Sequence, residues 1–511
     1  MHTKKIIGTM PVGAAIQDVP STELKPQAWA IVENAIPHKR ELRQRDGYNN
    51  VGGTGHRGNR FCAFDRTDGT RDILRLPRGE WWRYAGGVLT SGGALTGPRV
   101  QGIYTPTFAV YANRFYLGGL GLGLLDAVHY YNAGAAASAQ LGGASGYQTT
   151  QTKHVAQVVA FYGGRLILAN TVEDGVHYPY RIRWSAFTND ALWNAAANVG
   201  TGRVDMAHTR GQFLCALQLG ADLMLYKDDS IVRCRYLGDV PPFAFDLAVT
   251  DTGIWAPMTL VDCGFGHIFL SRRGVVLNRG GNQVDLIDEA IRRTFLAELS
   301  DVVDTDNASV ATCAWAVWDS TRSLYWLFYP RADTTGCYRA WVCHITAEGN
   351  QTWYNQVYTY EQTGGEFLRV YDVADGMRFE RWVMNGRLAG ADYANDGGRP
   401  IVFKLETPDF VADEEHLNRF KRWLGAEIEA RGSGADQRLT VQYSTDRGTT
   451  WEDAFDSDGN TYIALTATLS LEEIWWDVCS RTLRLQFENH PRDQQPTFRS
   501  YQIKFTVQAE M

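Results

Sequence analysis

A hairpin pattern recurs along most of this 511-residue chain, and it restricts the possible folds more than any other feature. In each copy an apolar or aromatic run enters a tight polar turn and a second apolar run leaves it, as in residues 158–168 (VVAFYGGRLIL). The turns lie near positions 69, 113, 164, 221, 266, 321 and 386, so successive turns are 44 to 65 residues apart. An all-strand repeat of about 40–50 residues is typical of β-propeller blades with four strands each.

The pattern therefore predicts an all-β protein with a β-propeller of about seven blades over residues 51–405. A single large β-sandwich with many hairpins is the alternative. Residues 1–50 are predicted to be an extended N-terminal lead-in, because Pro20 and Pro26 interrupt regular strand pairing. Strict alternation of apolar and polar residues, in segments such as 439–443 (LTVQY) and 483–487 (LRLQF), predicts a separate antiparallel β-sandwich over residues 406–511.

Two segments depart from the strand pattern. One short amphipathic helix is predicted near residues 286–299, where apolar residues keep helical spacing: Leu286, Ile287, Ala290, Ile291, Phe295 and Leu299. Residues 133–147 (AGAAASAQLGGASGY) are low in complexity, and such a segment buries little apolar surface. It is predicted to be a mobile loop that projects from a blade.

Composition limits the class of partner. The chain has 50 Lys and Arg against 57 Asp and Glu, a net charge of −7, which argues against gripping nucleic acid through overall charge. No run of 18 apolar residues is present, so no membrane insertion is predicted, and residues 1–8 lack the apolar core of a secretion signal. None of the eight Cys forms a Cys-x-x-Cys pair, and they are predicted to be reduced core residues.

The most specific local motif is an Asp-box-like turn at residues 444–451 (STDRGTTW). It matches the pattern Ser-x-Asp-x-Gly-x-Thr-Trp with Ser444, Asp446, Gly448 and Trp451. In such a turn the Asp carboxylate accepts bonds from turn N–H groups, the Gly takes a positive φ and the Trp packs beneath. Sialidases carry several such boxes away from their catalytic centres, and a single copy outside the predicted propeller indicates a structural turn.

Other motifs that could carry chemistry are incomplete. Residues 304–307 (DTDN) and 456–460 (DSDGN) resemble pieces of calcium loops but lack a distal bidentate Glu. Residues 119–123 (GLGLG) lack the Lys and the helix of a phosphate-binding loop. The 11 His are scattered, and no Gly-x-Ser-x-Gly elbow is present. No catalytic, cofactor-binding or metal-binding residues are therefore predicted, and the chain is predicted not to be an enzyme.

Several short motifs together resemble the tail-nozzle proteins of short-tailed bacteriophages. Residues 18–24 (DVPSTEL), Trp29, Asn34 and residues 45–48 (RDGY) are similar to the opening of that family. Blade-like motifs follow at residues 164–170 (GRLILAN), 183–185 (RWS), 192–193 (LW), 225–231 (LYKDDSI) and 269–276 (FLSRRGVV), ahead of 287–288 (ID). The resemblance covers roughly residues 18–330 and continues more loosely through Trp451.

The resemblance implies a structural protein of the virion tail, assembled in the host cytoplasm. Such nozzles are homo-oligomeric rings, usually hexamers, beneath the portal and adaptor proteins and near tail fibres or spikes. They extend the channel for double-stranded DNA and close it until genome ejection, without sequence-specific binding. A rigid disc of radial blades with short, protected edges suits that role. Basic residues such as Lys39, Arg40, Arg43 and Arg45 are expected to face protein neighbours and not the bore.

The propeller and the Asp box also fit a second function, a glycan-binding or glycan-cleaving, sialidase-like protein of the tail. A sialidase needs an arginine cluster and an acid–tyrosine pair that converge at the propeller axis, which sequence alone does not place.

Overall fold

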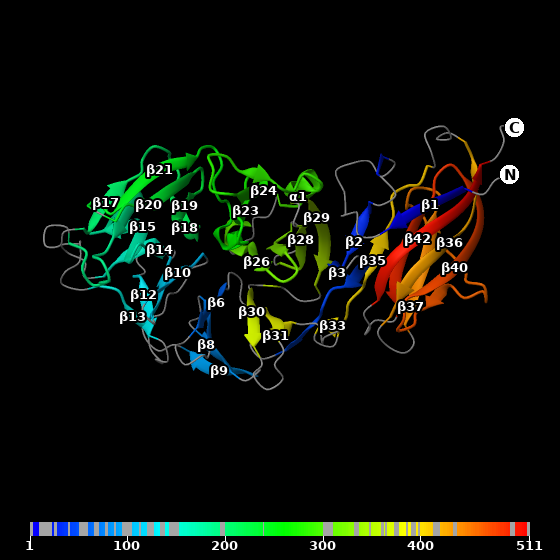
Figure 1. Ribbon diagram of the computed structural model, residues 1–511, viewed down its shortest axis with the longest axis horizontal. Coiled ribbons are helices and arrows are strands. Elements are labelled where there is room, and N and C mark those ends of the chain that lie inside the picture. Colours follow the sequence, from blue (N-terminus) through cyan, green and yellow to red (C-terminus); the bar gives the residue numbers. More distant parts are fainter. Residues whose placement is uncertain are drawn as a thin grey trace.

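The computed structural model describes most of the chain, namely residues 4–9, 23–24, 28–38, 41–50, 60–65, 71–76, 80–85, 88–94, 105–111, 114–119, 127–132, 138–142, 153–194, 200–238, 240–299, 310–331, 337–346, 349–358, 362, 365–371, 378–384, 387–389, 395–396, 399–411, 419–432, 437–490 and 496–507. The regular secondary structure of these residues is nearly all strand. Figure 1 shows an elongated molecule, with a ring of small sheets at one end and a stack of long strands at the other, where both termini lie.

The ring contains five separate sheets of four antiparallel strands, each in chain order. They are β6 (Arg60–Asp65), β7 (Arg71–Leu76), β8 (Glu80–Ala85) and β9 (Val88–Ala94); β10 (Thr107–Tyr111), β11 (Arg114–Gly118), β12 (His129–Asn132) and β13 (Ser138–Gln140); β14 (Val155–Tyr162), β15 (Arg165–Glu173), β16 (Val176–Trp184) and β17 (Gly202–Asp205); β18 (Phe213–Leu219), β19 (Asp222–Lys227), β20 (Ile231–Tyr236) and β21 (Phe243–Val249); and β22 (Val261–Asp262), β23 (His267–Ser271), β24 (Gly274–Asn278) and β25 (Asp285–Leu286).

Two further four-stranded units belong to larger sheets. The first is β26 (Trp315–Asp319), β27 (Leu324–Tyr329), β28 (Arg339–Ile345) and β29 (Gln351–Val357). The second is β30 (Gly365–Tyr371), β31 (Arg378–Met384) and β32 (Arg387–Ala389), completed by β5 (Tyr48–Asn50) from the N-terminal segment and extended by β33 (Asn395–Asp396) and β34 (Arg399–Pro400). Among first strands, β10 contacts β14, β14 contacts β18, β22 contacts β26 and β26 contacts β30, and β30 contacts β6, so the last unit meets the first. This is β-propeller architecture; the number of blades, about seven, stays a prediction.

All seven hairpins predicted from the sequence are antiparallel strand pairs in the structure. At the two-residue turn between β14 and β15, Gly163 and Gly164 take φ values of 56° and 72°, which glycine adopts without steric cost. The first six hairpins join the first and second strands of their units, whereas the seventh joins the second and third, β31 and β32. That shift explains why the last spacing is the longest.

Two predictions outside the hairpins need adjustment. The helix α1 (Arg292–Leu299) begins later than predicted, because Ile287 and Asp288 are hydrogen-bonded to β24. The Ile287 N–H donates to the Val275 carbonyl, and the Val275 N–H donates to the Asp288 carboxylate. Residues 138–140, inside the predicted mobile loop, form β13, which pairs with β12. Further helical segments in the described residues include α2 (Val310–Cys313) and a 3-10 turn at Pro257–Thr259. Among the described residues no helix has the length and apolar character to span a membrane.

The C-terminal residues form two facing antiparallel sheets, as predicted. One contains β3 (Ala35–His38), β4 (Glu41–Gln44), β42 (Thr497–Val507), β36 (Lys421–Arg431) and β40 (Ser470–Ser480) in that order, with β1 (Lys4–Thr9) also paired to β42. The other contains β35 (Lys404–Glu406), β41 (Arg484–His490), β37 (Arg438–Ser444) and β38 (Glu452–Asp453), with β39 (Tyr462–Ala464) on β37. The rings of Phe487, Phe498 and Tyr501 pack edge-on around Trp29, with centroids 5.6 to 6.2 Å from it.

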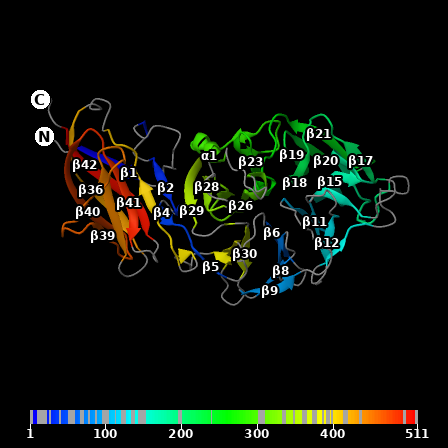
Figure 2. The same ribbon diagram turned by 180° about the vertical axis from the view of Figure 1, so that it is seen from behind.

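The predicted N-terminal lead-in contributes strands to both parts of the molecule. Strand β2 (Ile31–Glu33) pairs in parallel with β29 of the propeller and antiparallel with β35 of the sandwich, so a ten-stranded sheet runs through both. Asn34, with a φ of 56°, separates β2 from β3. Beyond β4, the chain reaches the propeller and adds β5 beside β32. Figure 2 shows β5 from behind, between β4 and β30.

Candidate functional site: the Asp-box-like turn and the Arg484 cluster

The turn after β37 closes around the carboxylate of Asp446. One carboxylate oxygen accepts hydrogen bonds from the Ser444 hydroxyl (2.7 Å) and the Thr450 N–H (2.8 Å), and the other accepts from the Thr450 hydroxyl (2.6 Å). Gly448 takes a φ of 85° and donates its N–H to the Ser444 hydroxyl oxygen. A Cβ at Gly448 would lie 3.4 Å from the ring of Trp451. The structure therefore places Ser444, Asp446, Gly448 and Trp451 in one turn.

These hydrogen bonds fix the charge of the turn. The side chain and N–H of Thr450, and then the Ser444 hydroxyl, lower the pKa of Asp446 to about 2. The side chain is exposed, yet both of its oxygens accept bonds from its own loop. A carboxylate held ionised in this way does not carry a proton at neutral pH, so it is suited to organising the turn and not to general acid catalysis.

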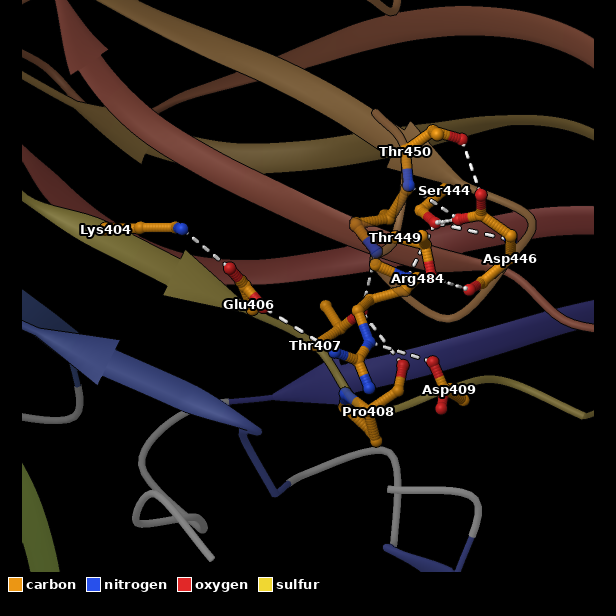
Figure 3. Close-up of polar contacts among 12 residues, drawn as sticks. Lys404, Glu406, Thr407, Pro408, Asp409, Ser444, Asp446, Thr449, Thr450 and Arg484 are labelled. Carbon is orange, nitrogen blue, oxygen red and sulfur yellow. Dashed lines mark hydrogen bonds and ion pairs between the residues drawn. The ribbon is translucent and has the colours of Figure 1, made fainter. Parts of the chain in front are cut away.

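Beneath the turn, Arg484 of β41 joins it to the segment that follows β35, as Figure 3 shows. Its Nε donates to Asp409 (2.8 Å) and its Nη1 lies 3.7 Å from Glu406, which also pairs with Lys404 at 2.7 Å. A Cβ at Gly448 would lie 3.0 Å from Arg484 Nη1, so glycine also makes room for this guanidinium. Sequence reasoning missed the cluster, because its members are up to 80 positions apart.

The side chains in this cluster are mostly hidden. Asp409 is 1% exposed, Glu406 6% and Arg484 14%. Each carboxylate has a cationic neighbour, so the arrangement neutralises charge beneath the turn. It offers structural support, without a free nucleophile or an open acid–base pair among these residues.

Two acid–tyrosine contacts bear on the glycan-cleaving alternative. The Tyr329 hydroxyl donates to Glu298 of α1 at 2.5 Å, and the Tyr116 hydroxyl donates to Asp190 at 2.6 Å beside Arg114. Burial raises the pKa of both tyrosines well above the ordinary value, and both side chains are buried. A tyrosine nucleophile needs a lowered pKa and access to substrate, so neither pair has the properties of a sialidase centre.

An arginine cluster lies within the sheet of β14–β17. Glu173 accepts hydrogen bonds from Arg183 at 2.7 and 2.6 Å and from Arg181 at 2.9 Å, while Arg181 also binds Asp205. Burial acts to raise the pKa of Glu173, but the bonds from Arg183 and Thr171 outweigh burial and lower it. Both guanidinium groups are at least nine-tenths buried and bound to carboxylates of their own sheet. They therefore hold strands together and do not present an anion-binding surface.

A third buried cluster centres on Arg45, one of the four basic residues singled out in the sequence. Arg45 binds Asp396 through two hydrogen bonds of 2.8 and 2.6 Å, and both side chains are 1% exposed. The same guanidinium donates to Asn34 and to the Val357 carbonyl and lies 4.1 Å above the ring of Tyr358. It thus ties the N-terminal segment to β29 and β33.

The neighbouring residues serve the same junction. Arg43 pairs with Asp46 at 2.7 Å, and Asp46 also pairs with Arg322 of the propeller. A Cβ at Gly47 would lie 2.0 Å from the Asn395 carbonyl oxygen, so only glycine allows this close approach of two backbones. Lys39 and Arg40 lie outside the described residues.

Where the structure describes the remaining motifs, they show no ligand site. In the 456–460 loop, Asp456 accepts the N–H groups of Asp458 and Asn460, which closes the loop on itself. Residues 304–307 and 120–123 lie outside the described part of the chain. Among described residues, no group of three His, Cys, Asp or Glu is arranged to hold a metal ion. The cysteines that the structure describes are buried, except for Cys479.

No family model matches the chain, and no curated protein matches it. Solved structures similar to it include YCF48 bound to a D1 peptide (10% identity, 41% of this chain and 61% of that one, TM-score 0.28). Others are an ancestral GH74 enzyme (9%, 71% and 51%, TM-score 0.40) and virginiamycin B lyase from Staphylococcus aureus (8%, 67% and 96%, TM-score 0.38). The chain thus spans less than two thirds of the first two. All three are β-propeller proteins, and at these identities the likeness concerns the fold alone.

Proposed function

We propose that the chain is a structural protein of a bacteriophage tail, which forms a ring-shaped nozzle that extends and gates the DNA channel for genome ejection. The ring is a homo-oligomer, proposed to be a hexamer, that contacts portal or adaptor proteins and tail fibres or spikes. Double-stranded DNA passes through it transiently. The support comes from the short motifs shared with tail nozzles and from the roles of those motif residues in the structure.

The observation that carries the proposal is that the motif residues hold distant parts of the chain together. Trp29 packs among the sandwich aromatics, and Arg45 joins the N-terminal segment to the propeller. Asp288 accepts the Val275 N–H and pairs with Arg292 at the start of α1. Ser185 accepts the Leu166 N–H between strands of one sheet. These residues belong to the motifs that resemble a family of scaffold proteins, and in this structure they serve in packing. Their role therefore favours a scaffold over an enzyme.

The joined sheets support the same proposal. Because β2 pairs with both β29 and β35, hydrogen bonds run without interruption from the propeller into the sandwich. A conduit needs a wall that keeps its shape while DNA moves past it, and a shared sheet resists hinge motion better than a flexible linker.

The glycan-binding or glycan-cleaving tail protein remains the second candidate, and the propeller together with the Asp-box-like turn favours it. The burial of Tyr116 and Tyr329 in the two acid–tyrosine contacts favours a non-enzymatic chain. Incubation with sialosides and host surface polysaccharide distinguishes the two, since turnover abolished by Glu298→Gln or Asp190→Asn would show a glycosidase.

The decisive experiment is negative-stain electron microscopy of the purified chain, followed by the same imaging after mixing with phage particles that lack their tail nozzle. The proposal expects rings with an axial opening, and restored tails after mixing. Monomers that neither form rings nor complete the tails contradict it.

A further inference from the structure

The outer edge of the sandwich carries exposed apolar side chains. Leu471 and Trp475 of β40 are 63% and 43% exposed, and Phe455 beside them is 47% exposed. Strand β40 is the last strand of its sheet and pairs only with β36 in the described residues, apart from one bridge to Phe455. Proteins usually blunt a long edge strand or cover it, because its backbone groups are ready to pair with another chain.

This edge is also acidic. Residues 451–480 contain seven Asp or Glu and no Lys or Arg. Lys504 pairs with both Glu427 and Glu473, so one positive charge serves two carboxylates, and Glu473 keeps 48% of its side chain exposed. A partner for this edge therefore needs to be apolar and basic.

The opposite edge of the same sheet has that chemistry. Strand β1 (KKIIGT) carries two lysines and no acid, and Ile7 is 52% exposed. In the described residues β1 pairs with β42 alone, so its other side is also an edge. Lys5 approaches Glu427 at only 3.9 Å and keeps 46% of its side chain exposed.

The backbone shows which residues face these two edges. Trp475 and Phe455 exchange N–H···O bonds across the β40 edge, at 2.7 and 3.2 Å. Bonding direction alternates along a strand, so Leu471 and Glu473 also direct their N–H and C=O groups outward. The registers of β40 on β36, β36 on β42 and β42 on β1 fix which residues of each strand direct their backbone groups to which neighbour. On β1, Lys5 and Ile7 are the residues whose N–H and C=O groups point away from the sheet.

We propose that the β1 edge of a second copy of this chain pairs antiparallel with residues 470–474 of β40. All neighbouring strands from β1 to β40 are antiparallel, so the added strand continues the sheet in the same sense. The pairing sets Ile7 of the second copy opposite Leu471 and its Lys5 opposite Glu473, an apolar pair and an ion pair. The half of β40 next to the Phe455 bridge is covered already, which confines the contact to 470–474.

The contact is head to tail, because it uses a different edge of each copy. Two β40 edges would instead bring acid against acid, which disfavours a symmetric dimer. A head-to-tail contact produces a ring if the rotation closes and a filament if it does not. Closure into a ring rests on the proposed function, whereas the contact itself does not.

The test mixes two variants that each lose one edge. Ile7→Glu removes the β1 edge and Leu471→Glu the β40 edge, and both change exposed side chains. Each variant alone is expected to remain a monomer of 57.2 kDa by light scattering where the wild type assembles. We expect each to raise the concentration for half-assembly about tenfold or more, a change of about 1.4 kcal/mol. Their equimolar mixture should give a dimer and stop, because only one intact edge of each kind remains.

Two controls make the outcome independent of folding. Val176→Glu, at a 51% exposed position on the propeller, should assemble like the wild type. Lys5→Glu and Glu473→Lys should each weaken assembly, and the double variant should restore it. A monomeric wild type, a mixture that stays monomeric, or single variants that assemble normally would overturn the inference. Filaments that show this dimer behaviour but do not complete phage tails would retain the contact and reject the nozzle.

Discussion

Loss of the Arg45 guanidinium is expected to destabilise the fold far more than loss of a partly exposed arginine. Arg45→Met keeps an unbranched side chain over Tyr358 but leaves Asp396 buried without its cation. It also removes at least five hydrogen bonds, including those to Asn34 and the Val357 carbonyl. Breaking a buried pair from one side costs about 3–5 kcal/mol, because the remaining charge stays desolvated.

The matched control is Arg431→Met. Arg431 pairs with Glu41 at 2.6 Å, but its side chain is 40% exposed, and such pairs contribute at most about 1 kcal/mol. Urea titration gives the free energy of unfolding where the transition is reversible, and thermal inactivation rates rank the variants where it is not. Hydrogen exchange should show lost protection in β2, β29 and β33 in the Arg45 variant alone.

A double variant separates the stranded charge from the lost contacts. Arg45→Met combined with Asp396→Leu removes the buried carboxylate as well, so it should recover part of the stability. If Arg45→Met costs no more than Arg431→Met, or if the double variant is less stable than the single, the argument from burial is wrong.

Three further outcomes follow from the structure. Asp446→Ala should lower the melting temperature of the sandwich without affecting assembly. The pKa of Asp446, about 2, lies below the ordinary value near 4, so the stability that its carboxylate contributes is full above about pH 4 and declines toward pH 2. NMR titration measures this pKa. Burial, with Arg183 nearby, lowers the pKa of His154 to about 4, so stability should decline as pH falls from about 6.5 through 4, and His154→Phe should flatten that part of the urea-midpoint curve. Assembled protein should bind duplex DNA weakly in low-salt gel shifts; tight, steeply salt-dependent binding that is lost in Lys39→Gln/Arg40→Gln would instead indicate a basic bore.

The hairpins and the sandwich were predictable because their signals are local. The alternation of apolar and polar residues in β37 and β41 is visible within a few consecutive residues, and so are the two glycines of the 163–164 turn. The Asp-box-like turn was predictable for the same reason, since the Asp446 carboxylate accepts its hydrogen bonds from Ser444 and Thr450 of the same turn.

The rest depends on partners far along the chain. Nothing near Asn34 indicates that β2 pairs with β29 and β35, because those strands lie more than 300 positions away. The small residues of β13 give no strand signal, yet an outer strand needs only β12 beside it. The ion clusters of Arg45, Glu173 and Arg484 read in sequence as scattered charges, and the structure shows which acids they meet.

The N-terminal segment closes both parts of the molecule. Strand β5 completes the propeller unit of β30–β32, while β1, β3 and β4 join the sheet that contains β42. Neither part is complete without the N-terminal segment, and β2 hydrogen-bonds to both. Because the same fifty residues carry Trp29, Asn34 and Arg45, a defect at this junction loosens the propeller and the sandwich together. The motif residues of the N-terminal segment therefore act as the link that makes two domains one mechanical unit.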